Sequence, residues 1–409
     1  MRHANFNFHP IGQGCFYTGE IYLADSNNTF NFVYDCGTDS KAIYLNNEID
    51  KYKNRIIDKS LDLLIISHFH DDHVSGVFRL LDGIHCKRLI IPYYLPIERL
   101  LLYAKSFSKN DDYRLMLQNP INFFSNDRFN IDEIILIGGP DKENKQDAET
   151  RQNPPFDKKT LENILDIKEF EFEAEFLNES ESKQMINNIN ELESDHINAN
   201  KLKLLSRPYA VLSSIWVFLF YLQRRDIDIT NFANDIDDLL EINKITLKDI
   251  FEVNILIELR EIYRRHFNVD LNTTSLVLFH EPLFKIENPS HFYLCNNLYI
   301  SSMICSRNKF GTLLTGDIYL NTITKIQKLQ DYFNGNMGQV CVFQVPHHGS
   351  ARNWLLTTPN SLESFCYYLI NHALGRKSHP SLKVVEHIKT NSKGIIILNN
   401  EIDFFRYGF

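Results

Sequence analysis

Short apolar runs separated by polar turns dominate the first 139 residues, a pattern that predicts strands and helices in close succession. Strands are expected over 6–11, 15–24, 29–37, 61–67, 87–94 and 131–139. The spacing of apolar positions predicts helices over 41–59, 74–83 and 96–108. Strand hairpins at the front, followed by alternating strands and helices, favour an α/β fold in which sheets are sandwiched between helices.

The pattern changes between residues 140 and 269. Residues 140–201 are polar and rich in Asn, Glu and Lys, as is typical of exposed loops and surface helices. Apolar positions then recur at helical spacing up to residue 268. The longest apolar run, Tyr209–Leu222, is interpreted as a buried helix, because a membrane span needs ~20 residues.

We therefore expect a mostly helical insertion over 140–269 that separates two halves of one fold, 1–139 and 270–409. This insertion is a candidate surface for a protein partner or for self-association. Beyond it, apolar runs predict further strands that start near residues 273, 292, 311, 340, 364 and 394. Helices are expected over 322–332 and 381–390.

Composition narrows the class of protein. The 409 residues include 44% hydrophobic and 23% charged side chains, which is ordinary for a globular protein. The net charge of −9 counts against binding of duplex nucleic acid through a basic face, although a small anionic substrate remains compatible with it. The N-terminus has no secretory signal pattern, and the seven scattered cysteines include no CxxC pair, so we expect a cytoplasmic protein without a membrane span.

The stretch "SHFHDDHVSG" at residues 67–76 follows an apolar strand and crowds five titratable groups together. His68 and His70 share one face of an extended chain because side chains two residues apart point the same way. Asp72 and His73 follow after a turn, so each pair could bind one ion of Zn²⁺, Mn²⁺ or Fe²⁺. The alternative is a solvated polar turn, and the buried strand that leads into the stretch counts against it. Asp71 is interpreted as a bystander.

This HxHxDH pattern after a buried strand resembles the signature of the metallo-β-lactamase fold superfamily. "LLTGD", which ends at Asp317, is similar to a later superfamily motif, and "YDCG" at 34–37 is similar to an early one. The resemblance implies an αββα sandwich with a dinuclear centre, in which Asp317 bridges two divalent ions. Zinc is favoured, with manganese or iron as alternatives. It also implies that Asp35 lies near the site and supports its loops.

A closer similarity, to the metallo-β-lactamase domain of ComEC-type DNA-uptake proteins, is carried by "NTTSLVL", "VPHHGS" and "RKSHPS". It implies that one histidine of the pair at 347–348 binds metal and the other lies beside the substrate, and that a later histidine completes the second metal site. The expected metal ligands are His68, His70, Asp72, His73, Asp317, His347 and His379. The expected catalytic residues are Asp72 and His348.

One position of the superfamily pattern has no obvious counterpart in this sequence. Many superfamily hydrolases carry a separate histidine between the HxHxDH motif and the bridging aspartate. The candidates in that interval are His85, His196, His266, His280 and His291. None has a convincing context, and His280 is interpreted as structural. We prefer His347 or His348 for this position.

These motifs predict a metal-dependent hydrolase in which hydroxide held by two metal ions attacks the substrate. A phosphodiesterase or nuclease that acts on nucleic acid or nucleotides is favoured, because a dinuclear centre suits a phosphodiester. The alternative is hydrolysis of a carbon ester, lactone or thioester. Di-iron redox chemistry and a binding module without activity are further classes, and the intact motif argues against both.

Overall fold

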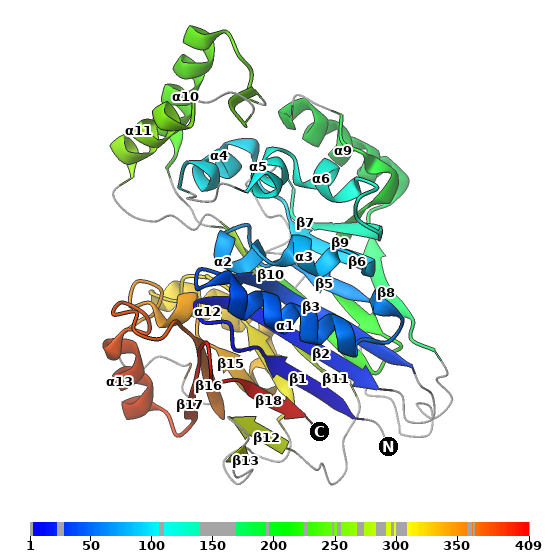
Figure 1. Ribbon diagram of the computed structural model, residues 1–409, viewed down its shortest axis with the longest axis vertical. Coiled ribbons are helices and arrows are strands. Elements are labelled where there is room, and N and C mark those ends of the chain that lie inside the picture. Colours follow the sequence, from blue (N-terminus) through cyan, green and yellow to red (C-terminus); the bar gives the residue numbers. More distant parts are fainter. Residues whose placement is uncertain are drawn as a thin grey trace.

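Two β-sheets stack face to face, and helices cover the outer side of each sheet (Figure 1). The computed structural model describes residues 3–22, 28–105, 110–139, 169–193, 196–224, 228–247, 249–251, 255–267, 274–283, 292–295, 298–299, 309–357, 362 and 365–408. Structural statements below concern these residues.

The first sheet pairs its strands in the order β13–β12–β18–β1–β2–β3–β5–β6–β7–β9, with β4 beside β6. Its strands are β1 (Ala4–Phe8), β2 (Gly14–Tyr22), β3 (Thr29–Thr38), β4 (Ser60–Leu61), β5 (Leu63–Ile65), β6 (His85–Pro92), β7 (Ile131–Ile137), β12 (Phe292–Cys295), β13 (Leu298–Tyr299), β18 (Phe405–Gly408) and the first part of β9 (Leu202–Leu212).

The second sheet has the order β8–β9–β10–β11–β14–β15–β16–β17. Its strands, besides the second part of β9, are β8 (Phe172–Phe176), β10 (Trp216–Arg224), β11 (Thr274–Pro282), β14 (Gly311–Leu314), β15 (Val340–Gln344), β16 (Tyr367–Asn371) and β17 (Ile395–Asn399). The α-helices are α1 (Ala42–Arg55), α2 (Asp71–Val74), α3 (Val77–Leu81), α4 (Pro96–Lys105), α5 (Asp111–Gln118), α6 (Pro120–Ser125), α9 (Glu179–Glu193), α10 (Thr230–Asn243), α11 (Leu256–His266), α12 (Ile323–Phe333) and α13 (Leu382–Asn391).

Three apolar layers hold this arrangement together. Side chains from the inner faces of both sheets, such as Phe32 and Phe218, meet in the central layer. A second layer lies between the first sheet and the helices from α1 to α6, and a third lies between the second sheet and α12 and α13. The predicted α/β fold, a four-layer αββα sandwich, is therefore confirmed, as are the predicted strands and helices of the first 139 residues that the structure describes.

The helix predicted over Tyr209–Leu222 is wrong, because this run forms a hairpin of strands β9 and β10. Trp216, Phe218 and Phe220 face the layer between the sheets, and the residues between them face the helices on the other side. A strand that is buried on both faces is apolar at every position, and periodicity alone cannot distinguish it from a buried helix. Ser213 and Ser214 turn the chain with positive φ angles.

Strand β9 also connects the two sheets, since its start pairs with β7 in the first sheet and its end with β10 in the second. The range 140–269 thus supplies strands of the sandwich as well as helices α9, α10 and α11 (Figure 1). Residues 140–168 lie outside the described residues, and the proposed division of the chain at 140 and 269 stays a prediction. Within the described ranges, no helix has the length and apolar character required to span a membrane.

The topology fixes the place of the site. Strands β3, β5 and β6 run parallel in the first sheet, and β14, β15 and β16 run parallel in the second. The carboxyl ends of parallel strands meet at one edge of a sheet, so the segments that follow β5, β14 and β15 gather there. These segments carry the motifs "SHFHDDHVSG", "TGD" and "PHHGS".

Candidate metal centre

The HxHxDH segment reaches the site through a close approach of two backbones. His68 and His70 lie just after β5, and helix α2 begins at Asp71. The end of β3 packs directly against this helix, because a Cβ at Gly37 would lie 2.5 Å from the main chain of His73. Only glycine permits this contact, which brings Asp35 on β3 to the ring of His73.

The other half of the site comes from turns that follow β14 and β15. Gly316 has a φ of 53° and places Asp317 at 2% exposure. His347 and His348 both adopt left-handed backbone angles, with φ values of 49° and 56°. Two consecutive residues of a strand would point to opposite faces, but this turn presents both rings to the site. The rings are 6.1 Å apart between centroids.

The two oxygens of the Asp317 carboxylate face different histidines. Oδ2 lies 3.4 Å from His68 Nε2 and 3.7 Å from His347 Nε2. Oδ1 lies 3.4 Å from His73 Nε2, which is itself 3.9 Å from Asp72 Oδ1. Three groups have ligand atoms within 4.8 Å of one another: His68, His70 and Asp317; His68, Asp72 and His73; and His73, Asp317 and His348.

These separations fit metal ligands better than hydrogen bonds. Atoms bound to one tetrahedral Zn²⁺ at ~2.1 Å lie roughly 3.4 Å apart, whereas hydrogen-bonded nitrogen and oxygen atoms lie about 2.9 Å apart. The Nε2 atoms of His68, His70 and His73 are buried and have no hydrogen-bond partner among the described residues. Buried polar atoms normally have a partner, so this donor set fits a bound divalent ion.

Hydrogen bonds at the Nδ1 atoms of His68, His73 and His348 orient these rings so that Nε2 points towards the cluster. Asp35 accepts the Nδ1–H of His73 at 2.7 Å. Although burial opposes it, the carboxylates of Asp35, Asp72 and Asp317 raise the pKa of His73 well above its usual value, and loss of the second proton to bind metal would leave the lone pair on Nε2. Asp35 also accepts from the Ser67 hydroxyl at 2.6 Å, and this hydroxyl in turn accepts the Nδ1–H of His68 at 2.8 Å. His348 Nδ1 donates to the main-chain oxygen of Asn371 at 3.0 Å.

Burial and neighbouring charges set the protonation of the cluster. Burial and the charge of Lys105 hold the pKa of His70 well below its usual value, and burial also lowers the pKa of His68. Both rings are therefore neutral at pH 7, which is the form that binds metal. Burial opposes ionisation of Asp317, but the neighbouring rings of His347, His68 and His73 lower the pKa of its carboxyl group well below the usual range.

Five of the other six predicted ligands thus lie around the Asp317 carboxylate. His379 lies beside them, stacked on His347 with 5.7 Å between ring centroids, and belongs to none of the three groups above. Burial, followed by the charges of His348 and His347, lowers the pKa of His379 to about 4. His347, with 22% of its side chain exposed, and Asp72, with 13%, form the edge of the cluster that solvent reaches. The ligand role of each residue stays a prediction.

The remaining candidates for the extra histidine lie away from the cluster. His280 is buried between the sheets and bonds to the Tyr17 hydroxyl at 2.8 Å, in agreement with its structural interpretation. His85 and His266 pair with surface aspartates, and the main-chain oxygen of His196 accepts a hydrogen bond from Asn122. His291 lies outside the described residues. The position on the Oδ2 side of Asp317 is instead occupied by His347.

Two supporting residues were not found from the sequence. Asn353 accepts a hydrogen bond from His347 Nδ1 at 2.9 Å, and the Tyr113 hydroxyl donates to the main-chain oxygen of Phe69, between His68 and His70, at 2.8 Å. A lone asparagine six residues after His347, or a tyrosine on a helix 44 residues after Phe69, carries no local signal. The Ser67 hydroxyl likewise became meaningful only once Asp35 lay beside it.

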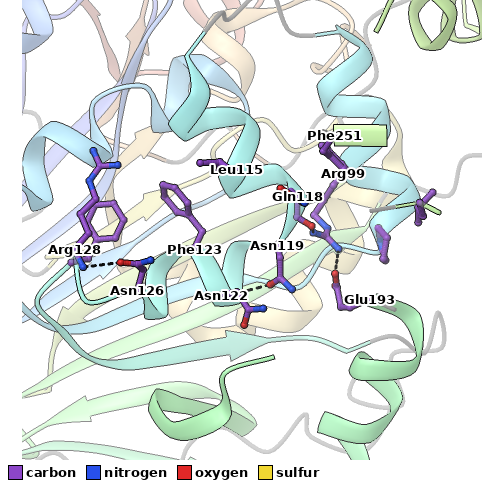
Figure 2. A pocket seen from close by; sticks show the side chains of 13 residues that line it. Arg99, Leu115, Gln118, Asn119, Asn122, Phe123, Asn126, Arg128, Glu193 and Phe251 are labelled. Carbon is purple, nitrogen blue, oxygen red and sulfur yellow. Dashed lines mark hydrogen bonds and ion pairs between the residues drawn. The ribbon is translucent and has the colours of Figure 1, made fainter. Parts of the chain in front are cut away.

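A separate cavity of about 330 Å³ lies among α4, α5, α6 and the end of α9 (Figure 2). Its floor includes Arg99, which is 1% exposed and pairs with Glu193 at 2.5 Å. None of the clustered histidines or aspartates lines it. Helix α5 contacts both the cavity and the metal-binding segment, since Leu115 lines the cavity and Tyr113 donates a hydrogen bond to the HxHxDH segment.

Comparison with known proteins agrees with this geometry. Residues 17–172 match the model of the metallo-beta-lactamase superfamily. This range includes Asp35 and the whole HxHxDH motif, whereas Asp317 and the histidine pair lie beyond it. The match covers less than half of the chain, the fold is an αββα sandwich, and the His–Asp cluster is a candidate site for divalent metal.

The protein was also compared with solved structures and with curated proteins. The crystal structure of unliganded yeast PDE1 aligns with 99% of this chain and 99% of its own, at 9% sequence identity and a TM-score of 0.41. A search among curated proteins found no match. The narrower similarity to ComEC-type domains is not tested by these comparisons and stays a prediction.

Proposed function

We propose that this protein is a metal-dependent hydrolase of phosphodiester bonds in nucleotides or nucleic acid, with two divalent ions, preferably zinc, in the cluster around Asp317. The supporting observation is the division of the Asp317 carboxylate, whose two oxygens face two separate sets of ligand atoms. One carboxylate with a histidine set on each side is suited to bridge two ions.

The same distances support an assignment of ligands. The Oδ2 side would hold the first ion through His68, His70 and His347. The Oδ1 side would hold the second ion through Asp72, His73 and His348. This assignment differs from the sequence-based one in two respects: His348 is a proposed ligand, because it belongs to a group with His73 and Asp317, and His379 is not. His347 belongs to none of the groups either and is kept because its Nε2 lies 3.7 Å from Asp317 Oδ2. His379 is then a neighbour of the substrate.

Two divalent ions would supply the Lewis acidity that activates water and stabilises the negative charge of a phosphoryl transition state. The protein's own residues orient these groups. Asp72 stands at the solvent-reached edge, where its Oδ2 lies 2.9 Å from His348 Nε2. Burial opposes ionisation of Asp72, but His73 and His348 hold the pKa of its carboxyl group well below the usual range, so the side chain is ionised as a metal ligand must be.

Positive side chains near the cluster favour an anionic substrate. Lys105, at the end of α4, acts electrostatically on His70 and on Asp39. Arg376 lies 3.7 Å from Asp39 and acts on His379. Lys105 is thus a candidate contact for the negative charge of a phosphate group, whereas the charge of Arg376 is offset by Asp39.

The test compares three substrates on enzyme loaded with zinc or manganese: bis-p-nitrophenyl phosphate, a lactone and a thioester. The proposal expects phosphodiester turnover that Asp317→Ala and His70→Ala reduce by at least about 10³-fold, because each removes a ligand. His266→Ala is a matched control, since His266 pairs with Asp235 at the surface and lies outside the cluster. Turnover of the lactone or thioester without any phosphodiester turnover would refute the proposed substrate class, and full activity of Asp317→Ala would refute the metal centre.

A further inference from the structure

Asn353 connects the two turns that carry the candidate ligands. It is fully buried, and its side-chain Nδ2 donates to the main-chain oxygens of Asp317 at 3.1 Å and Ile318 at 3.0 Å. Its main-chain oxygen accepts from the amide of Leu320 at 2.8 Å. One side chain thus fixes the turn after β14 against the turn after β15.

These contacts determine which way the Asn353 amide group points. Carbonyl oxygens only accept hydrogen bonds, so the two main-chain oxygens must face the NH₂ group. Oδ1 must therefore face His347 Nδ1, which lies 2.9 Å away. An amide oxygen also only accepts, and as a result Nδ1 of His347 carries the hydrogen atom.

The consequence for His347 concerns its other nitrogen. With the hydrogen on Nδ1, the neutral ring has its lone pair on Nε2, the atom that lies 3.7 Å from Asp317 Oδ2. In the same way, the Asp35 carboxylate accepts the Nδ1–H of His73, and the main-chain oxygen of Asn371 accepts that of His348. Asn353 is the corresponding acceptor for the ring that stands closest to solvent among these three.

We propose that Asn353 is a positioning residue that holds His347 in the Nδ1–H tautomer and so selects it as the ligand on the Oδ2 side of Asp317. This inference rests on the proposed metal centre and adds a residue outside the HxHxDH, TGD and PHHGS motifs. The acceptor is neutral and fixed by two carbonyl groups, so it orients the ring without adding another charge to the cluster.

The first measurement needs neither metal nor substrate. Selective ¹⁵N labelling of histidine reports the tautomer of each ring in the metal-free protein, and His347→Gln identifies the His347 signals. The Nδ1–H tautomer is expected in the wild type. A mixture of tautomers is expected in Asn353→Leu, whose side chain is similar in size but accepts no hydrogen bond. An unchanged His347 signal in this variant would overturn the inference.

The second measurement is zinc affinity by competition with a chromophoric chelator. Loss of an outer hydrogen bond to a histidine ligand typically costs 10- to 100-fold in metal affinity, and this loss is expected in Asn353→Leu for one of two sites. In a His347→Ala background, Asn353→Leu should cause no further loss, because its effect acts through that ring. An equal loss in both backgrounds would mean that Asn353 only supports the fold, and the inference would fail.

Two more variants separate the acceptor from the fold. Asn353→Asp keeps an acceptor for His347 but cannot donate to the two carbonyl groups, so it should retain more zinc affinity than Asn353→Leu. A loss equal to that of Asn353→Leu would contradict the inference. Asn400→Leu is the matched control, since this asparagine is also buried and its side chain bonds to Ile402 and Asp403 in the turn after β17, away from the ligand histidines. This variant should keep wild-type zinc affinity.

The outcome also separates this inference from the proposed function. A protein whose zinc affinity depends on Asn353 through His347, but which cleaves no phosphodiester, would refute only the substrate class. A protein that hydrolyses phosphodiesters equally well with Asn353→Leu, at limiting zinc and with an unchanged tautomer, would refute only the role of Asn353.

Discussion

Replacement of Asp35 by Asn tests whether outer hydrogen bonds prepare the histidines for metal. The Asp35 carboxylate is fully buried and accepts three hydrogen bonds: Oδ1 from the Ser67 amide at 2.6 Å, and Oδ2 from the Ser67 hydroxyl at 2.6 Å and from His73 Nδ1 at 2.7 Å. Asp35 has a φ of 57°, a left-handed angle that asparagine also tolerates. Asp35→Asn therefore changes the hydrogen bonds and spares the backbone.

The expected magnitude follows from those three bonds. The asparagine side chain has one acceptor oxygen, so whichever way it points, at least one buried donor loses its partner at a cost of about 1–3 kcal/mol. With the oxygen towards the Ser67 amide, the NH₂ group faces His73 and drives its hydrogen from Nδ1 to Nε2, which removes the lone pair that binds metal. We expect zinc affinity to fall by about 10- to 100-fold, or about 1.4–2.7 kcal/mol.

Chelator competition measures this affinity, and thermal unfolding of the metal-free protein measures stability separately. Asp62→Asn is the matched control: Asp62 is also buried and accepts from the main-chain amide of Asn31 at 2.8 Å, but it pairs with Lys87 away from the site. It should lose stability without losing zinc affinity. His73→Ala shows whether His73 is needed for zinc binding on the Oδ1 side of Asp317. If it is, zinc affinity of Asp35→Asn equal to that of the wild type would refute the reasoning.

Three further expectations concern pH, packing and loop support. Burial lowers the pKa of His280 to about 3, so the unfolded chain takes up its proton near pH 6.5 and the folded chain does not; stability should therefore fall by up to ~1.36 kcal/mol per pH unit between pH 6.5 and 3, and denaturant titrations of His280→Gln should show a weaker fall. Arg99→Leu leaves Glu193 buried without its cation and should cost about 3–5 kcal/mol of unfolding free energy, part of which Arg99→Leu with Glu193→Leu restores; equal stability of the single variant and the wild type would contradict this. Tyr113→Phe removes the hydrogen bond to the Phe69 oxygen and should cost about 1 kcal/mol, measured by urea unfolding, with weaker zinc binding as the sign that α5 supports the metal-binding segment.

Local sequence was sufficient where one segment contains the whole signal. The buried strand before His68, the shared face of His68 and His70, and the turn to Asp72 and His73 all lie within a dozen residues. Chain geometry alone constrains how such close neighbours can point. The strand hairpins at the front and the alternation that follows them were predictable for the same reason.

Sequence patterns failed where burial on two faces removed the periodic signal. Strand β10 packs against the other sheet on one side and against the outer helix layer on the other, so its apolar run predicted a helix. Only pairing with β9 and β11 distinguishes the two structures, and those partners are set by long-range contacts. The same long-range contacts show that part of the range 140–269 forms strands of the sandwich and not only helices.

By itself, the sequence determined that a motif of the metal-binding type, HxHxDH, follows a buried strand. It also determined that TGD and PHHGS motifs, which resemble those of the same superfamily, lie far downstream. The tertiary structure decided how these parts meet: that Asp317 presents one oxygen to His68 and the other to His73, and that His347 and His348 face different sides. It also decided that Asn353 orients one ring of the pair. The physical reason is that hydrogen bonds and metal coordination require atoms of residues hundreds of positions apart to be placed to within a few tenths of an ångström. Only the packed sheets and their turns fix distances so closely.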